Sequence, residues 1–263
     1  MRTIVITGST RGIGFGLAEA FLARDCSVVV SGRNPESIDK ACVDLAAKHE
    51  ASRVYGLVCD VTDERQVQDL WNATKARLGK IDIWINNAGI AHPQAEFWTL
   101  PTEEIRAVVS TNILGGMYGS RIALRGMLEQ GYGGLYNMEG FGADGRQTMK
   151  GMALYGASKA SIHYLTSSLM KETAGTTVIV GAIRPGMVVT DMLSSQYKGR
   201  PEDWERAKRI FNIIADPVTT VAPWVAEKVL SNRKNGVVFT RMGPAKIMGR
   251  FLIAPFRKRD LFV

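Results

Sequence analysis

The sequence predicts an α/β fold in which a doubly wound, seven-stranded parallel sheet carries helices on both faces. Short β-branched runs alternate with longer helix-like stretches, which is typical of βαβ units around a buried parallel sheet. A glycine-rich segment between the first expected strand and the first expected helix supports this reading. The 263 residues, 46% of them hydrophobic and 22% charged, suit a single domain spanning 1–263.

The expected strands are short apolar runs, and the expected helices are the longer segments between them. The strands are Ile4–Thr7, Val28–Ser31, Val54–Cys59, Ile81–Asn86, Gly134–Asn137, Thr177–Ile183 and Val237–Thr240. The helices are Gly12–Arg24, Pro35–Lys48, Glu64–Leu78, Glu103–Gln130 and Ala153–Glu172. The pattern predicts the Rossmann strand order 3-2-1-4-5-6 with a seventh strand at one edge.

Two segments depart from this alternation. Residues 186–220 separate the sixth and seventh strands without a clear strand of their own, and we interpret them as a segment that covers the substrate. Its apolar side chains could line a substrate pocket or serve as ordinary packing: Met187, Met192, Leu193, Trp204, Phe211 and Ile214. Residues 244–263 form a basic and apolar C-terminal extension, which could pack on the domain or a neighbouring subunit, or lie on an anionic membrane.

Composition excludes several classes of function. The net charge of +8 comes from basic residues scattered along the chain, which favours an ordinary solvated surface over a nucleic-acid site. The three cysteines form no CxxC pair and the three histidines lie far apart, so no metal site is predicted. No leader segment and no apolar run long enough to span a membrane is evident, so we expect a cytoplasmic protein.

The glycine-rich segment predicts a dinucleotide site. Glycines there let the backbone approach a pyrophosphate, and the following helix directs its N-terminal N–H groups at that anion. Arg11 lies within this loop and Arg33 follows the second strand. Arginines at the adenosine ribose suit a 2′-phosphate and thus NADPH, although both could be ordinary surface residues. The loop is Gly8, Ser9, Thr10, Arg11, Gly12, Ile13 and Gly14.

Two further strand ends are candidates for cofactor contacts. Asp60 and Val61 follow the third strand, where Asp60 could accept from the adenine amino group or cap the next helix in competition with Thr62 and Asp63. The fourth strand ends in Asn86, Asn87, Ala88 and Gly89, whose small residues permit close backbone approach but would also suit a plain turn.

Tyr155 and Lys159 are the candidate catalytic pair. On a helix, residues four apart share a face, so the phenol and the ammonium would point into one cleft. We expect the nearby cation to lower the pKa of the phenol from about 10 toward neutrality. The phenol could then give a proton to a carbonyl oxygen as hydride arrives.

These motifs together resemble the short-chain dehydrogenase/reductase family over nearly the whole chain. The family carries TGxxxGxG, NNAG, a catalytic Asn, YxxxK and a Pro-Gly pair, matched here from Thr7 to Pro185-Gly186. The resemblance implies that Lys159 also holds the nicotinamide ribose and that Asn112 anchors a water that relays protons to Lys159. It further implies nicotinamide contacts from Pro185, Gly186, Val188 and Thr190, and a homodimer or homotetramer formed through the long helices, with Gly115, Gly116, Gly119 and Gly126 permitting close approach.

One family element is missing, because no serine lies between Asn137 and Tyr155. The serine position falls on Gly140, beside Glu139. The bond to the reacting carbonyl could then come from a substrate group, a backbone N–H, Thr148 or a protonated Glu139. The alternative for Glu139 is a bond to neighbouring backbone.

The segment around Glu139 is similar to that of chlorophyll b reductases, which read F-N-M-D-G-x-G-S-x-G where this chain has 136–145. The segments 185–193, 210–215 and 257–262 are similar as well. The plant proteins carry transit and membrane segments not seen here, so a bacterial homologue is expected. The resemblance implies reduction of a 7-formyl tetrapyrrole with NADPH; the alternatives are a reductase of another bulky apolar aldehyde or ketone, and a regulator that binds the cofactor without turnover.

Overall fold

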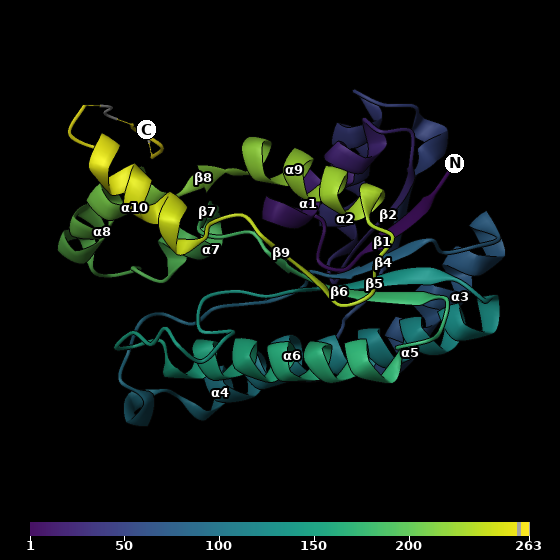
Figure 1. The fold of residues 1–263 in the computed structure, drawn as a ribbon, viewed down its shortest axis with the longest axis horizontal. Helices are drawn as coiled ribbons and strands as arrows, with labels where there is room; N and C mark the ends of the chain where they lie inside the picture. Colours follow the sequence, from purple (N-terminus) through teal and green to yellow (C-terminus); the bar gives the residue numbers. More distant parts are fainter. Residues whose placement is uncertain (257–258, 263) are drawn as a thin grey trace.

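The computed structural model describes residues 1–256 and 259–262. Its main sheet has seven parallel strands in the order β3-β2-β1-β4-β5-β6-β9, which confirms the predicted fold class and places the last strand at one edge (Figure 1). The strands are β1 (Thr3–Ile6), β2 (Ser27–Gly32), β3 (Val54–Val58), β4 (Ile83–Asn86), β5 (Gly133–Met138), β6 (Val178–Arg184) and β9 (Val237–Thr240).

Helices cover both faces of this sheet (Figure 1). One layer consists of α1 (Gly12–Leu22), α2 (Pro35–Ala46) and α9 (Val218–Ser231). The other consists of α3 (Glu64–Leu78), α5 (Gly115–Gln130) and α6 (Ala153–Glu172). Two short 3-10 turns complete the connections, at Ala51–Arg53 and Phe97–Thr99.

The core lies in two layers because successive strand residues face opposite sides of the sheet. Ile4 and Ile6 pack toward α1 and α9, whereas Val5 packs toward α3 and α5. All three are fully buried. Strands buried on both faces read as continuous apolar runs, which is why the sequence revealed them.

The predicted single helix over Glu103–Gln130 is interrupted. It consists of α4 (Thr102–Val108), a π-helical segment (Val109–Leu114) and α5. The π-helical segment contains the buried Asn112, whose side chain bonds the backbone of Ile90. Such segments frequently occur at functional sites.

The glycines of α5 are already used within the chain. A Cβ at Gly126 would lie 2.0 Å from the Trp71 ring, and one at Gly119 would lie 2.1 Å from Asn86 Oδ1. Gly115 and Gly116 similarly abut Val61 and Ile162. These residues let α5 pack on the sheet and its neighbouring helices, so they do not support close approach between subunits.

The segment after β6 is more structured than expected. It contains β7 (Val188–Val189), α7 (Asp191–Ser195), α8 (Pro201–Ile214) and β8 (Asp216–Pro217), and the two short strands pair in parallel. Four of the apolar residues considered for pocket lining or for packing build a small separate core with Tyr197, Ala215, Leu261 and Phe262: Met187, Leu193, Trp204 and Phe211. The geometry therefore favours the packing interpretation for these four.

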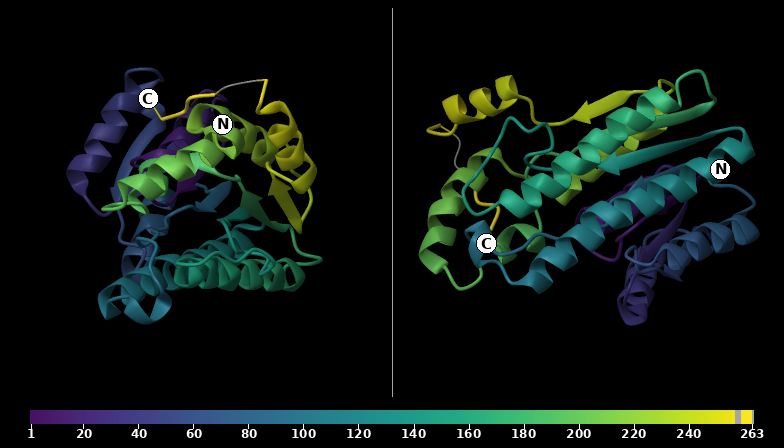
Figure 2. Two further views of the ribbon diagram at one scale, coloured as in Figure 1. Left: turned by 90° about the vertical axis from the view of Figure 1, so that its left-hand side faces the viewer. Right: turned by 90° about the horizontal axis from the view of Figure 1, so that it is seen from below.

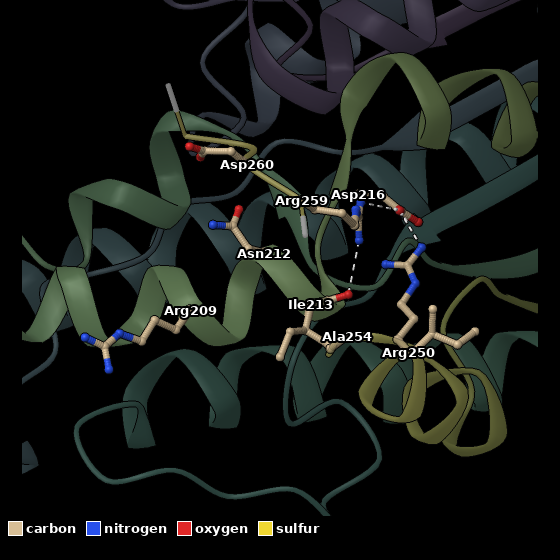
Figure 3. Close-up of a pocket in the computed structure, with 9 residues that line it drawn as sticks. Arg209, Asn212, Ile213, Asp216, Arg250, Ala254, Arg259 and Asp260 are labelled. Atoms are coloured by element: carbon tan, nitrogen blue, oxygen red, sulfur yellow. Dashed lines mark hydrogen bonds and ion pairs between the residues drawn. The ribbon is translucent and has the colours of Figure 1, made fainter. Parts of the chain in front are cut away.

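The C-terminal helix α10 (Pro244–Ile253) lies against α8 at the end of the molecule away from the N-terminus (Figures 1 and 2). The nearby Asp216, whose side chain is 4% exposed, pairs with Arg241 at 3.1 Å and with Arg250 at 2.6 Å. Arg259 of the C-terminal segment lies at 3.5 Å from the same carboxylate (Figure 3). Burial alone would raise the pKa of Asp216, but the hydrogen bond and charge of Arg250, together with Arg241, lower it.

The extension predicted over 244–263 thus packs on the segment 186–220, although its residues 257, 258 and 263 lie outside the described part of the chain. Among the residues that the structure describes, no helix is both long and apolar enough to cross a membrane.

We predict that Asp216→Asn loosens α10 without unfolding the main sheet. Removing the carboxylate charge leaves Arg241 and Arg250 partly buried without a counterion, which costs on the order of 3 kcal/mol. Native-state hydrogen exchange should show faster exchange in α10 and unchanged protection in β1 and β4. Wild-type protection in α10 would contradict the assigned role of Asp216.

Candidate active site

The phosphate loop sits where β1, β4 and α1 meet. Gly8 has a φ of +62°, and a Cβ there would lie 2.8 Å from Ala88 Cα. Both the dihedral angle and the close approach therefore require glycine at position 8. The Arg11 side chain does not cap the start of α1. The N–H groups of the first helical turn are therefore available to bind an anion at the phosphate loop.

Asn87 ties the end of β4 to this loop. Its Nδ2 donates to the carbonyl oxygens of Thr7 and Gly8, both at 2.9 Å. The backbone N–H groups of Asn87 and Ala88 donate to Thr7 Oγ1 at 3.0 and 3.1 Å. The two predicted motifs are thus one hydrogen-bonded unit, and Ser9 extends it by bonding Ile6 and Ser31.

The residues predicted at the adenosine end are exposed. Arg33 and Arg11 carry accessible side chains, and Arg11 is 4.0 Å from Asp191, which is also exposed. Asp63, not Asp60, caps α3. Asp60 Oδ1 instead accepts from the backbone and hydroxyl of Thr62, which leaves Oδ2 without a partner among the described residues.

The end of β6 closes the other side of the cleft. Pro185 and Val188 are buried, and Gly186 has a φ of +78°. A Cβ on Gly12 would lie 3.6 Å from Thr190 Cγ2. The segment after β6 therefore reaches back to the phosphate loop, as a shared cofactor site requires.

Tyr155 and Lys159 occupy one face of α6, as predicted. Lys159 is buried, and its Nζ donates to the carbonyl of Met138 at 3.2 Å and lies 5.7 Å from the centre of the Tyr155 ring. Burial lowers the pKa of Lys159 to about 8, opposed by the charge of Glu139. Burial raises the pKa of Tyr155 to about 12, so the expected depression of the phenol pKa is absent and the phenol is protonated at neutral pH.

Asn112 joins this group through its side chain. Its Oδ1 accepts from the Ile90 backbone at 2.8 Å, and its Nδ2 donates to Ile90 and to Ser158 Oγ at 2.9 and 3.0 Å. A Cβ on Gly89 would lie 3.4 Å from Asn112 Oδ1 and 3.5 Å from Lys159 Nζ. Asn112 and Lys159 thus border the same glycine at the end of β4.

Gly140 lies directly beside the Tyr155 phenol. A Cβ there would come within 2.7 Å of Tyr155 Oη and 3.3 Å of Lys159 Cε. A serine at this position could fit only if Tyr155 moved. The missing serine is therefore matched by a close approach of the backbone to the phenol. Thr148, the other candidate donor, is exposed in the loop that follows.

Glu139 is buried and held by two cationic or polar partners. Its Oε2 accepts from Arg184 Nε at 2.6 Å, and its Oε1 lies 2.9 Å from His163 Nδ1. The Glu139 backbone N–H also donates to the Ile183 carbonyl at 2.9 Å. Both carboxylate oxygens thus have partners within the protein, so of the two roles considered for Glu139 the geometry favours the structural one.

The sequence interpretation missed Arg184 and His163. Both had weak signals: His163 stands one helical turn after Lys159, and Arg184 directly precedes the Pro185-Gly186 pair. Within the described residues, no group of three or more potential metal ligands occurs, so the structure offers no candidate metal site there.

Residues 2–201 match the short chain dehydrogenase family. The chain is 37% identical over 231 residues to the chloroplastic chlorophyll(ide) b reductase NOL of Oryza sativa subsp. japonica, covering 86% of this chain and 66% of that protein. It is 34% identical over 277 residues to the probable chlorophyll(ide) b reductase NYC1 of the same plant, covering 99% and 54%. The chain thus spans between about half and two thirds of these relatives' lengths.

Among solved structures, ElxO with NADP bound superposes with a TM-score of 0.81 at 25% identity, covering 91% of this chain and 96% of that one.

We predict that Gly8→Ala destabilises the fold by about 3 kcal/mol, since it adds a backbone collision to the left-handed dihedral angle. Gly79→Ala is the matched control, because Gly79 has a φ of +75° but a Cβ there would meet no other atom within 4 Å. The control should cost only about 1 kcal/mol. Urea unfolding measures both, and equal losses would show that the contact with Ala88 contributes nothing.

Proposed function

The chain belongs to the short-chain dehydrogenase/reductase family, and from that premise we propose that it is an NADPH-dependent carbonyl reductase. We further propose that its substrate is the 7-formyl group of chlorophyll b or chlorophyllide b, reduced to 7-hydroxymethyl. One observation supports the reductase proposal most strongly. The Tyr155 phenol, which keeps its proton at neutral pH, lies beside both the Gly140 backbone and the buried Lys159.

The cofactor proposal rests on the phosphate loop and its arginines. The uncapped start of α1 suits a pyrophosphate, and Gly12, Ile13 and Gly14 continue the loop into that helix. Arg11 and Arg33 supply accessible guanidinium groups suited to a 2′-phosphate. Asp60 Oδ2 is available to an adenine amino group. Bound there, NADPH would supply the hydride, and ElxO, a structural neighbour, is described with NADP bound.

The chain's own residues supply the proton. Tyr155 has a pKa of about 12, so it holds its proton until a developing alkoxide takes it. Lys159 is buried and cationic below about pH 8, so it stabilises the phenolate that forms on Tyr155. The same ammonium could donate a hydrogen bond to a hydroxyl of the nicotinamide ribose. Asn112 is a positioning residue: it fixes Ile90 and Ser158, and Ser158 in turn bonds the Tyr155 carbonyl at 2.7 Å.

We propose that Glu139 is also a positioning residue rather than a proton donor. Its bonds to Arg184 and His163 join β5, β6 and α6 at the point where the chain turns toward Gly140. Its charge raises the pKa of Lys159 against the effect of burial. The substrate oxygen is then held by Tyr155 and by backbone N–H groups near Gly140 and Gly142, in place of the serine hydroxyl.

The tetrapyrrole proposal is supported by the two chlorophyll(ide) b reductases, since their similarity extends beyond the shared cofactor motifs. The segment 186–220, which we propose covers the substrate, adds apolar surface from the partly exposed Met192. A reductase of another bulky apolar aldehyde or ketone is the second candidate. A regulator without turnover is disfavoured by the intact group of Tyr155, Lys159 and Asn112.

An absorption assay tests the proposal. Chlorophyllide b mixed with the protein and NADPH should shift from the spectrum of a formyl pigment to that of the 7-hydroxymethyl pigment. Tyr155→Phe should bind NADPH normally and lose about 100-fold or more in turnover. If the wild type reduces simpler apolar aldehydes but leaves the pigment unchanged, the second candidate replaces the first.

The oligomeric state is a separate proposal. Met117, Leu128 and Tyr164 on the long helices α5 and α6 expose apolar surface, which favours a homodimer or homotetramer formed there. A monomeric mass by light scattering at micromolar concentration would exclude it.

We predict that Arg33→Asp weakens NADPH binding more than NADH binding by about 1–3 kcal/mol, as one charge-assisted contact to the 2′-phosphate is lost. Arg125→Asp, an exposed arginine on α5, is the control for net charge. Titration calorimetry with both cofactors measures the difference. If Arg33→Asp lost the same binding affinity for NADPH as for NADH, Arg33 would not contact the 2′-phosphate.

The pH profile separates the two roles considered for Glu139. Reduction should fall as pH rises through about 8, since Lys159 then loses its proton. Glu139→Gln removes a charge that raises the Lys159 pKa, so its falling limb should move to lower pH. If Glu139 instead donated a proton to the substrate, the activity of Glu139→Gln should fall less steeply with rising pH than that of the wild type. Asp144→Asn, an exposed acid of the same loop, should leave the limb unchanged.

A further inference from the structure

Helix α10 and the turn after it present an apolar stripe that nothing in the described chain covers. Met248, Leu252 and Phe256 follow one another at intervals of one helical turn and are 63%, 70% and 90% exposed. Phe251, beside them, is 46% exposed. Scattered apolar residues are ordinary on a surface, but four large ones within one short segment form a contiguous patch.

The opposite face of α10 is fixed to the protein. Arg250 donates to the backbone of Ile214 and Ala215 and pairs with Asp216 at 2.6 Å. Figure 3 shows this guanidinium directed toward Asp216, and α10 lies at the edge of the molecule in both views of Figure 2. The ionic contact therefore determines which face of the helix looks outward.

The segment that carries the stripe is basic, and the acids beside it in the adjoining pocket are Asp216, which is paired with arginines, and Asp260. From Lys228 to Arg259 the sequence contains lysines and arginines but neither Asp nor Glu. Lys246 is exposed near the N-terminal end of the stripe. Arg209 of α8 lines the adjoining pocket of about 740 Å³ and is exposed, with no hydrogen bond or ion pair to another described residue.

From this arrangement we propose that α10 docks on an anionic lipid surface, with Met248, Leu252 and Phe256 entering the interface and the exposed Lys246 and Arg209 adding positive charge beside it. An apolar face flanked by basic residues is the pattern of helices that lie in the plane of a membrane. Binding combines burial of apolar side chains with attraction of cations to anionic lipid.

A second copy of this chain fits the surface less well. Two copies related by a two-fold axis would place the same basic segment on both sides of the contact, so like charges would face each other. An anionic bilayer has the complementary sign. The proposal does not depend on which carbonyl compound the enzyme reduces.

Vesicle sedimentation of the full chain tests the proposal. The wild type should sediment with vesicles of phosphatidylcholine containing roughly one third phosphatidylglycerol, about tenfold more strongly than with phosphatidylcholine alone. Raising the salt concentration should weaken the binding, because screening reduces the attraction. Failure to sediment with anionic vesicles at low salt would overturn the proposal, whatever the enzymatic result.

Matched variants locate the contact. Leu252→Gln combined with Phe256→Gln should reduce vesicle partitioning at least about tenfold, since glutamine keeps helix propensity and removes the apolar surface. Val43→Gln, which replaces a 68% exposed apolar residue on α2, should bind vesicles like the wild type. Equal partitioning of the double variant and the wild type would contradict the proposal. A double variant that instead loses a solution dimer would overturn it by identifying the stripe as a subunit interface.

Discussion

The ion pair between Glu139 and Arg184 is the interaction on which the candidate site most depends. A buried carboxylate is tolerated only with a partner, and here the partners come from β6 and α6, so three elements are fixed at one point. The residues on either side of Glu139 then contact the candidate catalytic pair. The Met138 carbonyl accepts from Lys159, and the Gly140 backbone lies against the Tyr155 phenol. In a chain without the family's serine, the paired Glu139 carboxylate thus fixes the strand end that contacts both the phenol and the ammonium.

A second buried carboxylate, that of Asp216, joins the segment 186–220 to the C-terminal part of the chain in a similar way. Asp216 joins β8, the end of β9 and α10 through Arg241 and Arg250. Both carboxylates lie near the carboxyl ends of β5, β6 and β9, the edge of a parallel sheet where ligands bind. The segment 186–220 therefore has its own small aromatic core, in which the ring centroids of Trp204, Phe211 and Phe262 lie 5.1–6.3 Å apart. Of the two roles considered for the apolar residues of this segment, this core favours packing over lining a pocket.

Much of the fold could be predicted from the sequence because its signals are local. Apolar runs identified the seven strands of the main sheet but not the short β7 and β8, and the glycine loop and the Tyr155–Lys159 spacing marked the cleft. Long-range contacts were not predictable. The partners of Glu139 stand 24 and 45 residues away, and the phenol pKa depends on burial that no pattern reveals. The glycines of α5 were assigned to an interface between subunits, whereas Trp71 and Asn86 of the same chain occupy the space beside them. The π-helical turn at Asn112 also depends on a tertiary contact, with Ile90.

In the proposed reaction, hydride from the nicotinamide reaches a formyl carbon while Tyr155 supplies the proton. A single turnover of chlorophyllide b with NADPH deuterated at both hydrogens of the nicotinamide C4, followed by mass spectrometry of the pigment, tests this directly. We expect a product with one deuterium, located on the hydroxymethyl carbon, and almost no product with Tyr155→Phe. A hydroxymethyl pigment without deuterium, or full labelling with Tyr155→Phe, would contradict it.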